Sequence, residues 1–307
     1  MRLSGTAVNV KWAAGTAAVA VCLIASAGHI AAAPQFSGSE HAGLGTPTRV
    51  ETALAADADT ALFAREVETR DALGFPVGVK RIGRHVLDGF EHAEYDEVTE
   101  VDSAGKVQAV TQFDSRGHLR AAVRLDAAPA SKSRVTRDGA VRSAQKSARA
   151  AGLDIGTPTS TQADQATGGW TVHWARMQAG VRVRGDETRV QVWPDGRIQS
   201  VARAEHDLAA APVQRIGSDA ARQVASANLD SWSAGRNSGY AIQNVYLEWV
   251  GPNAAFDPDR ATADEAPYRL AWVAEVKPFG DAANYAWLIS LFIDAGDGSI
   301  IGGDLVE

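Results

Sequence analysis

The sequence feature that most constrains the fold is a two-residue alternation of apolar and polar side chains, interrupted by short turn signals. It is clearest over 179–202, AGVRVRGDETRVQVWPDGRIQSVA, where valines occupy every second position of two runs. Such alternation buries one face of a strand, and turns that contain Gly or Pro reverse the chain. We therefore expect two β-hairpins, with turns at residues 185–186 and 194–196, and a bulge near Gln199.

The same signals recur on both sides of this stretch. Over 95–125, Gly-containing turns at 103–106 and 115–118 separate three β-prone runs, which indicates an antiparallel meander. Further β-prone runs lie after residue 240. They occupy 241–250, 268–276 and 285–306.

Three segments have the spacing of an α-helix. The first covers 51–69, and the third begins at Ser218 and runs to 229. Thr136 or Asp138 can cap the second helix, which Gly152 can close. Small residues form one stripe of this helix, so that it can pack closely on a sheet. They are Ala140, Ala144, Ala148 and Ala151.

A helix followed by strands occurs over 135–202 and again over 216–303, and we interpret these as two variants of one unit. The expected fold class is α+β, with two related helix-on-antiparallel-sheet units preceded by an antiparallel β-meander. Every tryptophan after residue 33 lies in these two segments. We expect aromatic cores between helices and sheets, with a carbohydrate-binding platform as the alternative. The tryptophans are Trp170, Trp174, Trp193, Trp232, Trp249, Trp272 and Trp287.

Residues 1–33 have the pattern of a secretory signal peptide, with Arg2 and Lys11 before an apolar run over 13–28 and small residues after it. We expect cleavage and a secreted, extracellular or envelope-associated protein without an integral membrane span, and an uncleaved anchor is the alternative. The single cysteine, Cys22, lies in this leader, so the mature chain has no disulfide and no thiol nucleophile. Loss of Arg2 and Lys11 changes the formal charge from −7 to −9, which argues against nucleic acid as a partner.

The stretch GVRVRGDETRVQVWPDGRIQSV resembles the hairpin of the fungalysin/thermolysin-type propeptide (FTP) module. Arg182 departs from the Pro that is usual in that family. The positions that match are Gly180, Val181, Val183, Gly185, Val190, Val192, Asp195, Gly196, Ile198, Ser200 and Val201.

The segment that follows is similar to the PepSY domain, which comes next in those propeptides. Its short helix corresponds to 216–229, and YRLAWVAEV, with Trp272, looks like a strand of that domain. LFIDAGDGSIIGG, with Asp294 and Gly298, looks like its ending, although Asp297 replaces the usual Thr. The expected organisation is a signal peptide (1–33), a flexible linker (34–50), an N-terminal helix plus β-meander (51–128), an FTP-like unit (129–206) and a PepSY-like domain (207–307).

In the zymogens of that family, the propeptide acts as chaperone and inhibitor of the metalloprotease domain that follows it. The present sequence has no His-Glu-x-x-His zinc motif. The resemblance therefore implies a non-catalytic protein, without the protease domain, that binds an extracellular metalloprotease and inhibits or chaperones it. An extended segment or sheet edge would occupy the substrate cleft. The candidate partner-binding residues are Arg182, Arg184, Pro194, Asp195, Gly196, Arg197, Gly302, Gly303 and Asp304.

Two alternatives remain open. In the first, the propeptide-like fold is reused in an envelope-associated binding or scaffold protein, and the presence of the segment 51–128 favours this hypothesis. In the second, the chain is an unrecognised hydrolase that uses carboxylates. We expect no cofactor, no metal and no catalytic residue. The group nearest to a metal cluster matches no known ligand spacing, and surface positions are favoured for it. It consists of His85, Glu91, His92 and Glu94. Turn chemistry explains Asp294 and Asp297 better than calcium binding does.

Overall fold

The computed structural model describes residues 49–53, 56–88, 93–126, 134–165, 167–213, 215–233, 238–253, 266–284 and 286–306. The expected signal peptide and nearly all of the expected linker lie outside these residues. The helices are α1 (Ala56–Leu73), α2 (Arg137–Ala150), α3 (Ser218–Ser233) and the 3-10 helix η1 (Asp281–Asn284). The strands are β1 (Arg49–Ala53), β2 (Lys80–Asp88), β3 (Ala93–Val101), β4 (Val107–Asp114), β5 (Leu119–Arg124), β6 (Ser160–Ala163), β7 (Trp170–Gln178), β8 (Val181–Val192), β9 (Ile198–Ala204), β10 (Ser238–Val250), β11 (Arg269–Gly280), β12 (Leu288–Asp294) and β13 (Ile300–Val306).

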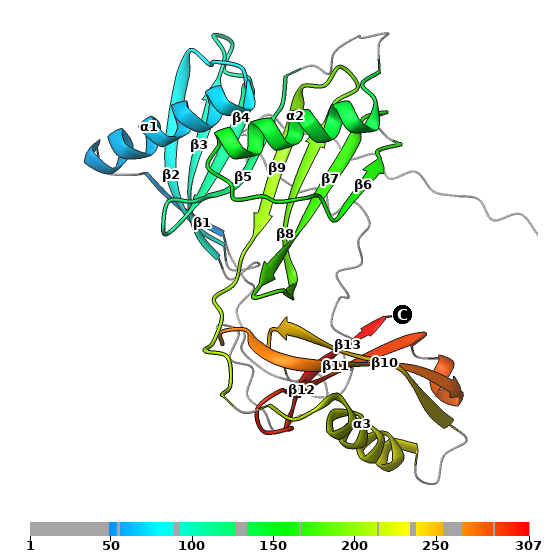
Figure 1. Cartoon of the computed structure of the whole chain (residues 1–307). Helices are drawn as coiled ribbons and strands as arrows, with labels where there is room; N and C mark the ends of the chain where they lie inside the picture. The colour runs from blue at the N-terminus through cyan, green and yellow to red at the C-terminus, as the bar shows by residue number, and fades with distance from the viewer. Residues whose placement is uncertain are drawn as a thin grey trace, which may run out of the picture.

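The strands form one mixed sheet in the order β1-β2-β3-β4-β5-β9-β8-β10-β11-β12-β13, with β6 and β7 branching from β8. Named strands pair antiparallel except β8 and β10, which meet in parallel at Val183 and Trp249. Figure 1 shows α1 and α2 on the same side of the N-terminal strands, and α3 beside the C-terminal strands. Each of these three helices is followed in sequence by four strands.

The expected fold class is wrong. Of the described residues, 49% lie in strands and 21% in helices, and one 13-stranded sheet replaces the two helix-on-sheet units. The reason lies at the strand edges, because β5 pairs with β9 and β8 pairs with β10. Pairing satisfies backbone donors and acceptors of β5 and β9 that would otherwise be open to other chains, whereas β8 and β10 share the single pair of Val183 with Trp249. The expected domain boundaries within this sheet stay predictions.

Several local expectations are confirmed. The meander over 95–125 forms as β3, β4 and β5, joined by the two expected turns. The hydroxyl of Thr136 accepts a hydrogen bond from the Gly139 N–H at the start of α2, as a helix N-cap does. Three of the four small residues predicted for α2 are fully buried against β7, β8 and β9, namely Ala140, Ala144 and Ala148. The fourth, Ala151, is the C-cap of the helix and is only half-buried.

One of the two expected hairpin turns is wrong. Strand β8 runs through Gly185 and Asp186 without reversing, and the chain reverses instead at Ala179 and Gly180, where both residues have positive φ. This conformation fits a two-residue hairpin turn of the primed type. The turn over 193–197 and the bulge at Gln199 are confirmed, since Gln191 pairs with Ser200 while Val192 pairs with Ile198.

The tryptophans are not all in aromatic cores. Trp174, Trp193 and Trp249 are buried, whereas Trp287 is 60% exposed beside the start of β12, so the expectation fails there. Two mixed apolar clusters, one under α1 and α2 and one under α3, form the main cores.

Within the described residues, no helix is long and apolar enough to cross a membrane.

Candidate functional site

The bulged middle of β8 joins the N-terminal strands to the C-terminal strands. Between Ala175 and Met177 of β7, the register with β8 shifts from Glu187 to Arg182, so the intervening residues of β8 leave the ladder. Gly185, at φ +80°, provides the left-handed conformation that this irregularity needs. Residues 183–186 of β8, which do not pair with β7, pack on the C-terminal strands. We call this region the β8 junction. Its apolar part comprises Val181, Val183, Leu208, Leu247, Trp249, Leu270, Trp272, Tyr268 and Ala295.

The guanidinium of Arg184 is the polar centre of the β8 junction. Its Nε donates to Asp304 at 2.9 Å and its Nη1 donates to Glu248 at 2.9 Å. It also donates to the Ser290 hydroxyl and lies over the Phe292 ring, 5.2 Å from the centroid. Burial alone would lower the pKa of Arg184, but the carboxylates of Asp304 and Glu248 outweigh burial and raise it. A permanently charged arginine therefore connects β8 to strands β10, β12 and β13.

Asp186, two residues further along β8, anchors the connection between β9 and the C-terminal strands. Its side chain is fully buried; it accepts from Arg176 at 2.8 Å, from the backbone N–H of His206 at 3.0 Å, and contacts the His206 ring. That ring stacks on Tyr268, with centroids 4.3 Å apart. Burial raises the pKa of Tyr268 to about 12, and the charges of Asp186 and Asp304 add to the effect.

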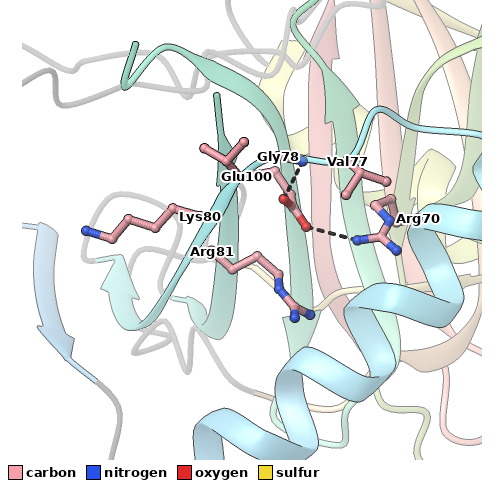
Figure 2. Close-up of a pocket in the computed structure, with 7 residues that line it drawn as sticks. Arg70, Val77, Gly78, Lys80, Arg81 and Glu100 are labelled. Atoms are coloured by element: carbon pink, nitrogen blue, oxygen red, sulfur yellow. Dashed lines mark hydrogen bonds and ion pairs between the residues drawn. The ribbon is translucent and has the colours of Figure 1, made fainter. Parts of the chain in front are cut away.

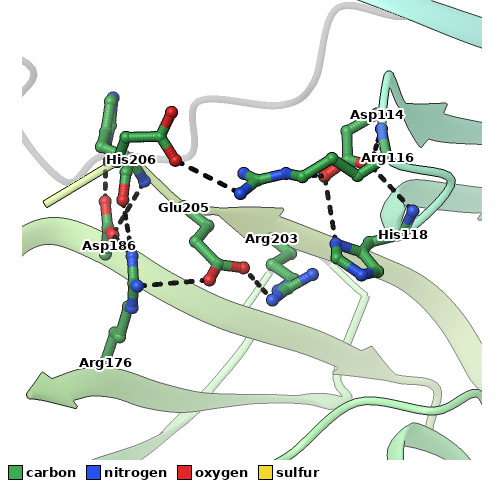
Figure 3. A network of polar contacts seen from close by, with 9 residues as sticks. Asp114, Arg116, His118, Arg176, Asp186, Arg203, Glu205 and His206 are labelled. Atoms are coloured by element: carbon green, nitrogen blue, oxygen red, sulfur yellow. Dashed lines mark hydrogen bonds and ion pairs between the residues drawn. The ribbon is translucent and has the colours of Figure 1, made fainter. Parts of the chain in front are cut away.

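Further ion pairs extend this network across the surface (Figure 3). Arg116, in the turn between β4 and β5, contacts Asp207 at 3.2 Å, and Arg203 pairs with Glu205, which also contacts Arg176. Because the partners come from β7, β9, the turn after β4 and the segment after β9, the network restrains the chain where it passes between the two sets of strands. These partly exposed pairs contribute little stability each.

A second feature is a hollow of about 400 Å³ between the end of α1, the second half of α2 and the turn before β9. We call it the interhelix hollow. Its floor includes Leu73 and Ile198, both buried. Ser143 on one wall donates its hydroxyl proton to the Gly196 carbonyl at 2.6 Å, which fixes the turn against α2. The lining residues are Asp71, Ala72, Leu73, Gly74, Ser143, Lys146, Ser147, Ala150, Gly196, Arg197 and Ile198.

Arg197 lies at the rim of the interhelix hollow. Its Nε donates to Asp195 at 2.6 Å, its Nη1 is 3.7 Å from Asp126, and its guanidinium lies 4.9 Å from the centroid of Trp193. Trp193 is buried, so the turn is fixed from below. Lys146 is exposed on the helix that forms the opposite wall. The hollow thus combines an apolar floor, serine hydroxyls and two cations at its rim.

A smaller hollow, about 140 Å³, lies where α1 crosses β2 and β3 (Figure 2), and we call it the Arg81 hollow. Glu100 accepts from the Gly78 N–H at 2.7 Å and from Arg70 at 3.2 Å. A Cβ at position 78 would lie 2.5 Å from the Glu100 carboxylate, so this contact requires Gly78. The lining residues are Arg70, Val77, Gly78, Val79, Lys80, Arg81 and Glu100.

Glu66, on α1, is buried behind this hollow. Its side chain is 1% exposed, and its Oε2 lies 3.7 Å from Nη1 of Arg81 and 3.9 Å from Nη1 of Arg70, beyond hydrogen-bond distance. Burial, and then the negative charge of Glu100, raise the pKa of Glu66 to about 7, against the two arginines, which lower it. A titrating carboxyl group therefore sits between helix and sheet, closed off from substrates.

The structure brings some of the sequence-predicted residues together and separates others. Arg182, Arg184 and Asp304 meet at the β8 junction, where Arg182 lies 3.9 Å from Glu248. Residues 194–197 lie at the other end of β8, by the interhelix hollow. Gly302 and Gly303 are buried in β13, where the amide of Asn253 donates to the Gly303 carbonyl and accepts from its N–H. The C-terminal segment is therefore an integrated strand that pairs with β12 on one side and contacts Asn253 on the other.

The remaining predicted positions have structural roles. Asp294 accepts from the Gly296 N–H and pairs with Arg269 at 2.7 Å, in the turn where Gly298 has φ +79°, as turn chemistry predicts. Trp272 donates its indole N–H to the Ile216 carbonyl.

The group nearest to a metal cluster is only partly described. Glu91 and His92 lie outside the described residues, whereas His85 contacts Glu94 and Asp96 across β2 and β3. Among the described side chains, no group of three or more His, Cys, Asp or Glu could hold a metal ion.

Sequence reasoning missed Glu66, Asp186, His206 and the arginines of the Arg81 hollow. Glu66 lies in α1 and Glu100 in β3, and no local sequence pattern indicates that this helix and this strand cross. Asp186 gave a signal, the Gly-Asp dipeptide, which we interpreted as a turn.

Comparison with known proteins places few constraints on this chain. No family model and no curated protein matches it. Among solved structures, the Bacillus megaterium YpeB C-terminal domain is similar, with a TM-score of 0.41 and 13% sequence identity over 83% of this chain and 99% of that chain. The FTP and PepSY resemblance stays a prediction.

Proposed function

We propose that this chain is a secreted, non-catalytic binding protein whose partner is an extracellular protease, which it inhibits or chaperones. The interhelix hollow is the contact site. The observation that carries the proposal is that Gly196 and Arg197, in the hairpin that resembles the propeptide module, line the hollow together with the exposed Lys146.

The chemistry of the hollow suits a loop of a folded protein. The buried side chains of Leu73 and Ile198 form a floor for an apolar side chain, and the hydroxyl of Ser147 can hydrogen-bond a peptide backbone. Lys146 adds a cation for a carboxylate at the rim, where such a charge mainly increases the association rate. The β8 junction anchors the start of the hairpin strand on the C-terminal strands, and the hydrogen bond of Ser143 to Gly196 holds the turn at its other end.

The test uses residues 34–307 as bait in spent medium of the producing cells, followed by mass identification and a proteolysis assay with casein. The proposal expects capture of a protease whose activity changes as bait is added. Ser147→Phe fills the hollow and should abolish capture. The matched control, Ser226→Phe, changes an exposed residue of α3 and should not. Equal capture by both variants would remove the hollow from the proposal.

One observation favours the alternative of an envelope scaffold. The end of α1, residues 71–74, forms a wall of the hollow, and this part of the chain has no counterpart in the propeptide pattern. Capture of wall material or of a protein that is not a protease, sensitive to Ser147→Phe, would support this alternative.

A further inference from the structure

Among the described strands, β1 covers only part of the edge of β2. Strand β1 pairs with β2 from Asp88 to Arg84 and ends there, at Ala53, whereas β2 begins four residues earlier, at Lys80. Residues 80–83 pair with β3 on one side, and the described part of the chain places no strand on the other. An uncovered edge is a template for another strand, because it presents backbone donors and acceptors in register.

The part of β2 that no described strand covers, residues 80–83, adjoins the Arg81 hollow. Lys80 and Arg81 belong to both, and Figure 2 shows their side chains on opposite sides of the strand. Just before them, Val77 and Val79 are 70% and 72% exposed, which is high for valine. A strand added here would therefore meet backbone groups along the edge and apolar side chains at its end.

At the Arg81 hollow the negatively charged side chains are buried, whereas Lys80 and Arg81 are exposed at the surface. The carboxylates of Glu66 and Glu100 have side chains that are 1% and 2% exposed, whereas the Arg81 side chain is 37% exposed and Lys80 is also exposed. An approaching segment consequently meets cations first, while the anions that balance them lie beneath. This arrangement complements an acidic segment and disfavours a basic one.

We propose that residues 80–83 of β2, with the Arg81 hollow, bind an extended acidic segment of a partner protein as an added strand, antiparallel to β2 and in line with β1. Main-chain hydrogen bonds hold the segment, its carboxylates on one face contact Lys80, and its apolar side chains on the other face contact Val77 and Val79. This inference rests on the proposed function as a binding protein and adds a second contact, away from the interhelix hollow.

The test measures fluorescence anisotropy with labelled octapeptides and the 34–307 protein. One probe alternates Val and Glu, and its counterpart alternates Val and Lys. Two further Val-Glu probes carry N-methyl groups on the odd or on the even residues, so that each loses the backbone donors of one edge. The protein variants are Lys80→Glu and, as a matched control, Arg222→Glu on the exposed side of α3.

The inference expects saturable binding of the unmethylated Val-Glu probe and no binding of the Val-Lys probe. One of the two N-methylated Val-Glu probes should lose binding. Lys80→Glu should lower the affinity for the Val-Glu probe at least about fivefold, whereas Arg222→Glu should leave it unchanged. Equal binding of the Val-Lys probe, retention by both N-methylated probes, or no binding would overturn it. If the Val-Glu probe fails while Ser147→Phe still abolishes capture, the edge is refuted and the proposed function stands.

Discussion

The buried carboxyl group of Glu66 makes the stability of the protein depend on pH. In the unfolded chain this group has an ordinary pKa of 4.5, whereas burial beside Glu100 raises it to about 7 in the folded protein. Between these values the folded state binds more protons than the unfolded state, so the free energy of unfolding falls as pH rises. The contribution is fully present below pH 4.5 and is lost as pH passes through about 7.

Glu66→Gln removes this dependence, because the amide stays neutral at every pH. A difference of about 2.5 pKa units corresponds to about 3 kcal/mol at 1.36 kcal/mol per unit. The stability of the variant relative to the wild type should therefore increase by about 3 kcal/mol between pH 4.5 and pH 8. Urea unfolding at several pH values, followed by tryptophan fluorescence, measures this difference.

The control is Glu68→Gln, which replaces an exposed carboxyl group on the same helix and should keep the loss of stability that Glu66 causes in the wild type between pH 4.5 and 8. If Glu66→Gln and the wild type lost stability in parallel from pH 4.5 to 8, the carboxyl group would be ionised in the folded protein like any other, and the reasoning would be refuted.

Three further predictions concern stability, each measured by urea unfolding. A double-mutant cycle of Arg184→Ala and Glu248→Gln should give a coupling of about 1–3 kcal/mol, because the pair is largely buried; additive effects would contradict the account of the β8 junction. Ala144→Leu should lower the free energy of unfolding by about 1–3 kcal/mol, since Ala144 has no exposed surface on the side of α2 that packs on the sheet. A neutral result would show that α2 can shift away from the sheet to make room. Gly169→Ala should cost about 2 kcal/mol, because its Cβ would overlap the Val192 carbonyl oxygen, whereas Gly156→Ala, in open space, should stay within about 0.5 kcal/mol.

The sequence predicted elements whose determinants are local. Helix α2 begins at its cap and buries its small stripe as expected, since a hydroxyl at Thr136 and alanines at helical spacing act within a few residues. The turns between β3, β4 and β5 follow from glycines with positive φ, Gly105 and Gly117. In each case the residues that determine the element lie within the element itself or directly beside it in the sequence.

The arrangement of the strands could not be predicted in the same way. The pairing of β5 with β9 joins Ala122 to Val201, far apart in the sequence, and the sequence of neither strand indicates which strand it pairs with. The glycine at 185 predicts positive φ correctly, yet the same conformation serves a turn or a bulge, and only the packing of Val183 on Trp249 decides for the bulge. The two hollows escaped prediction because their walls come from elements that meet only after the sheet has formed.

Hydrogen–deuterium exchange with and without the captured partner tests the central claim most directly. The account predicts slower exchange, on complex formation, in the three segments that line the interhelix hollow, 71–74, 143–150 and 196–198. Unchanged exchange there, with protection confined to β13 over 300–306, would contradict it and would place the contact at the C-terminal strand.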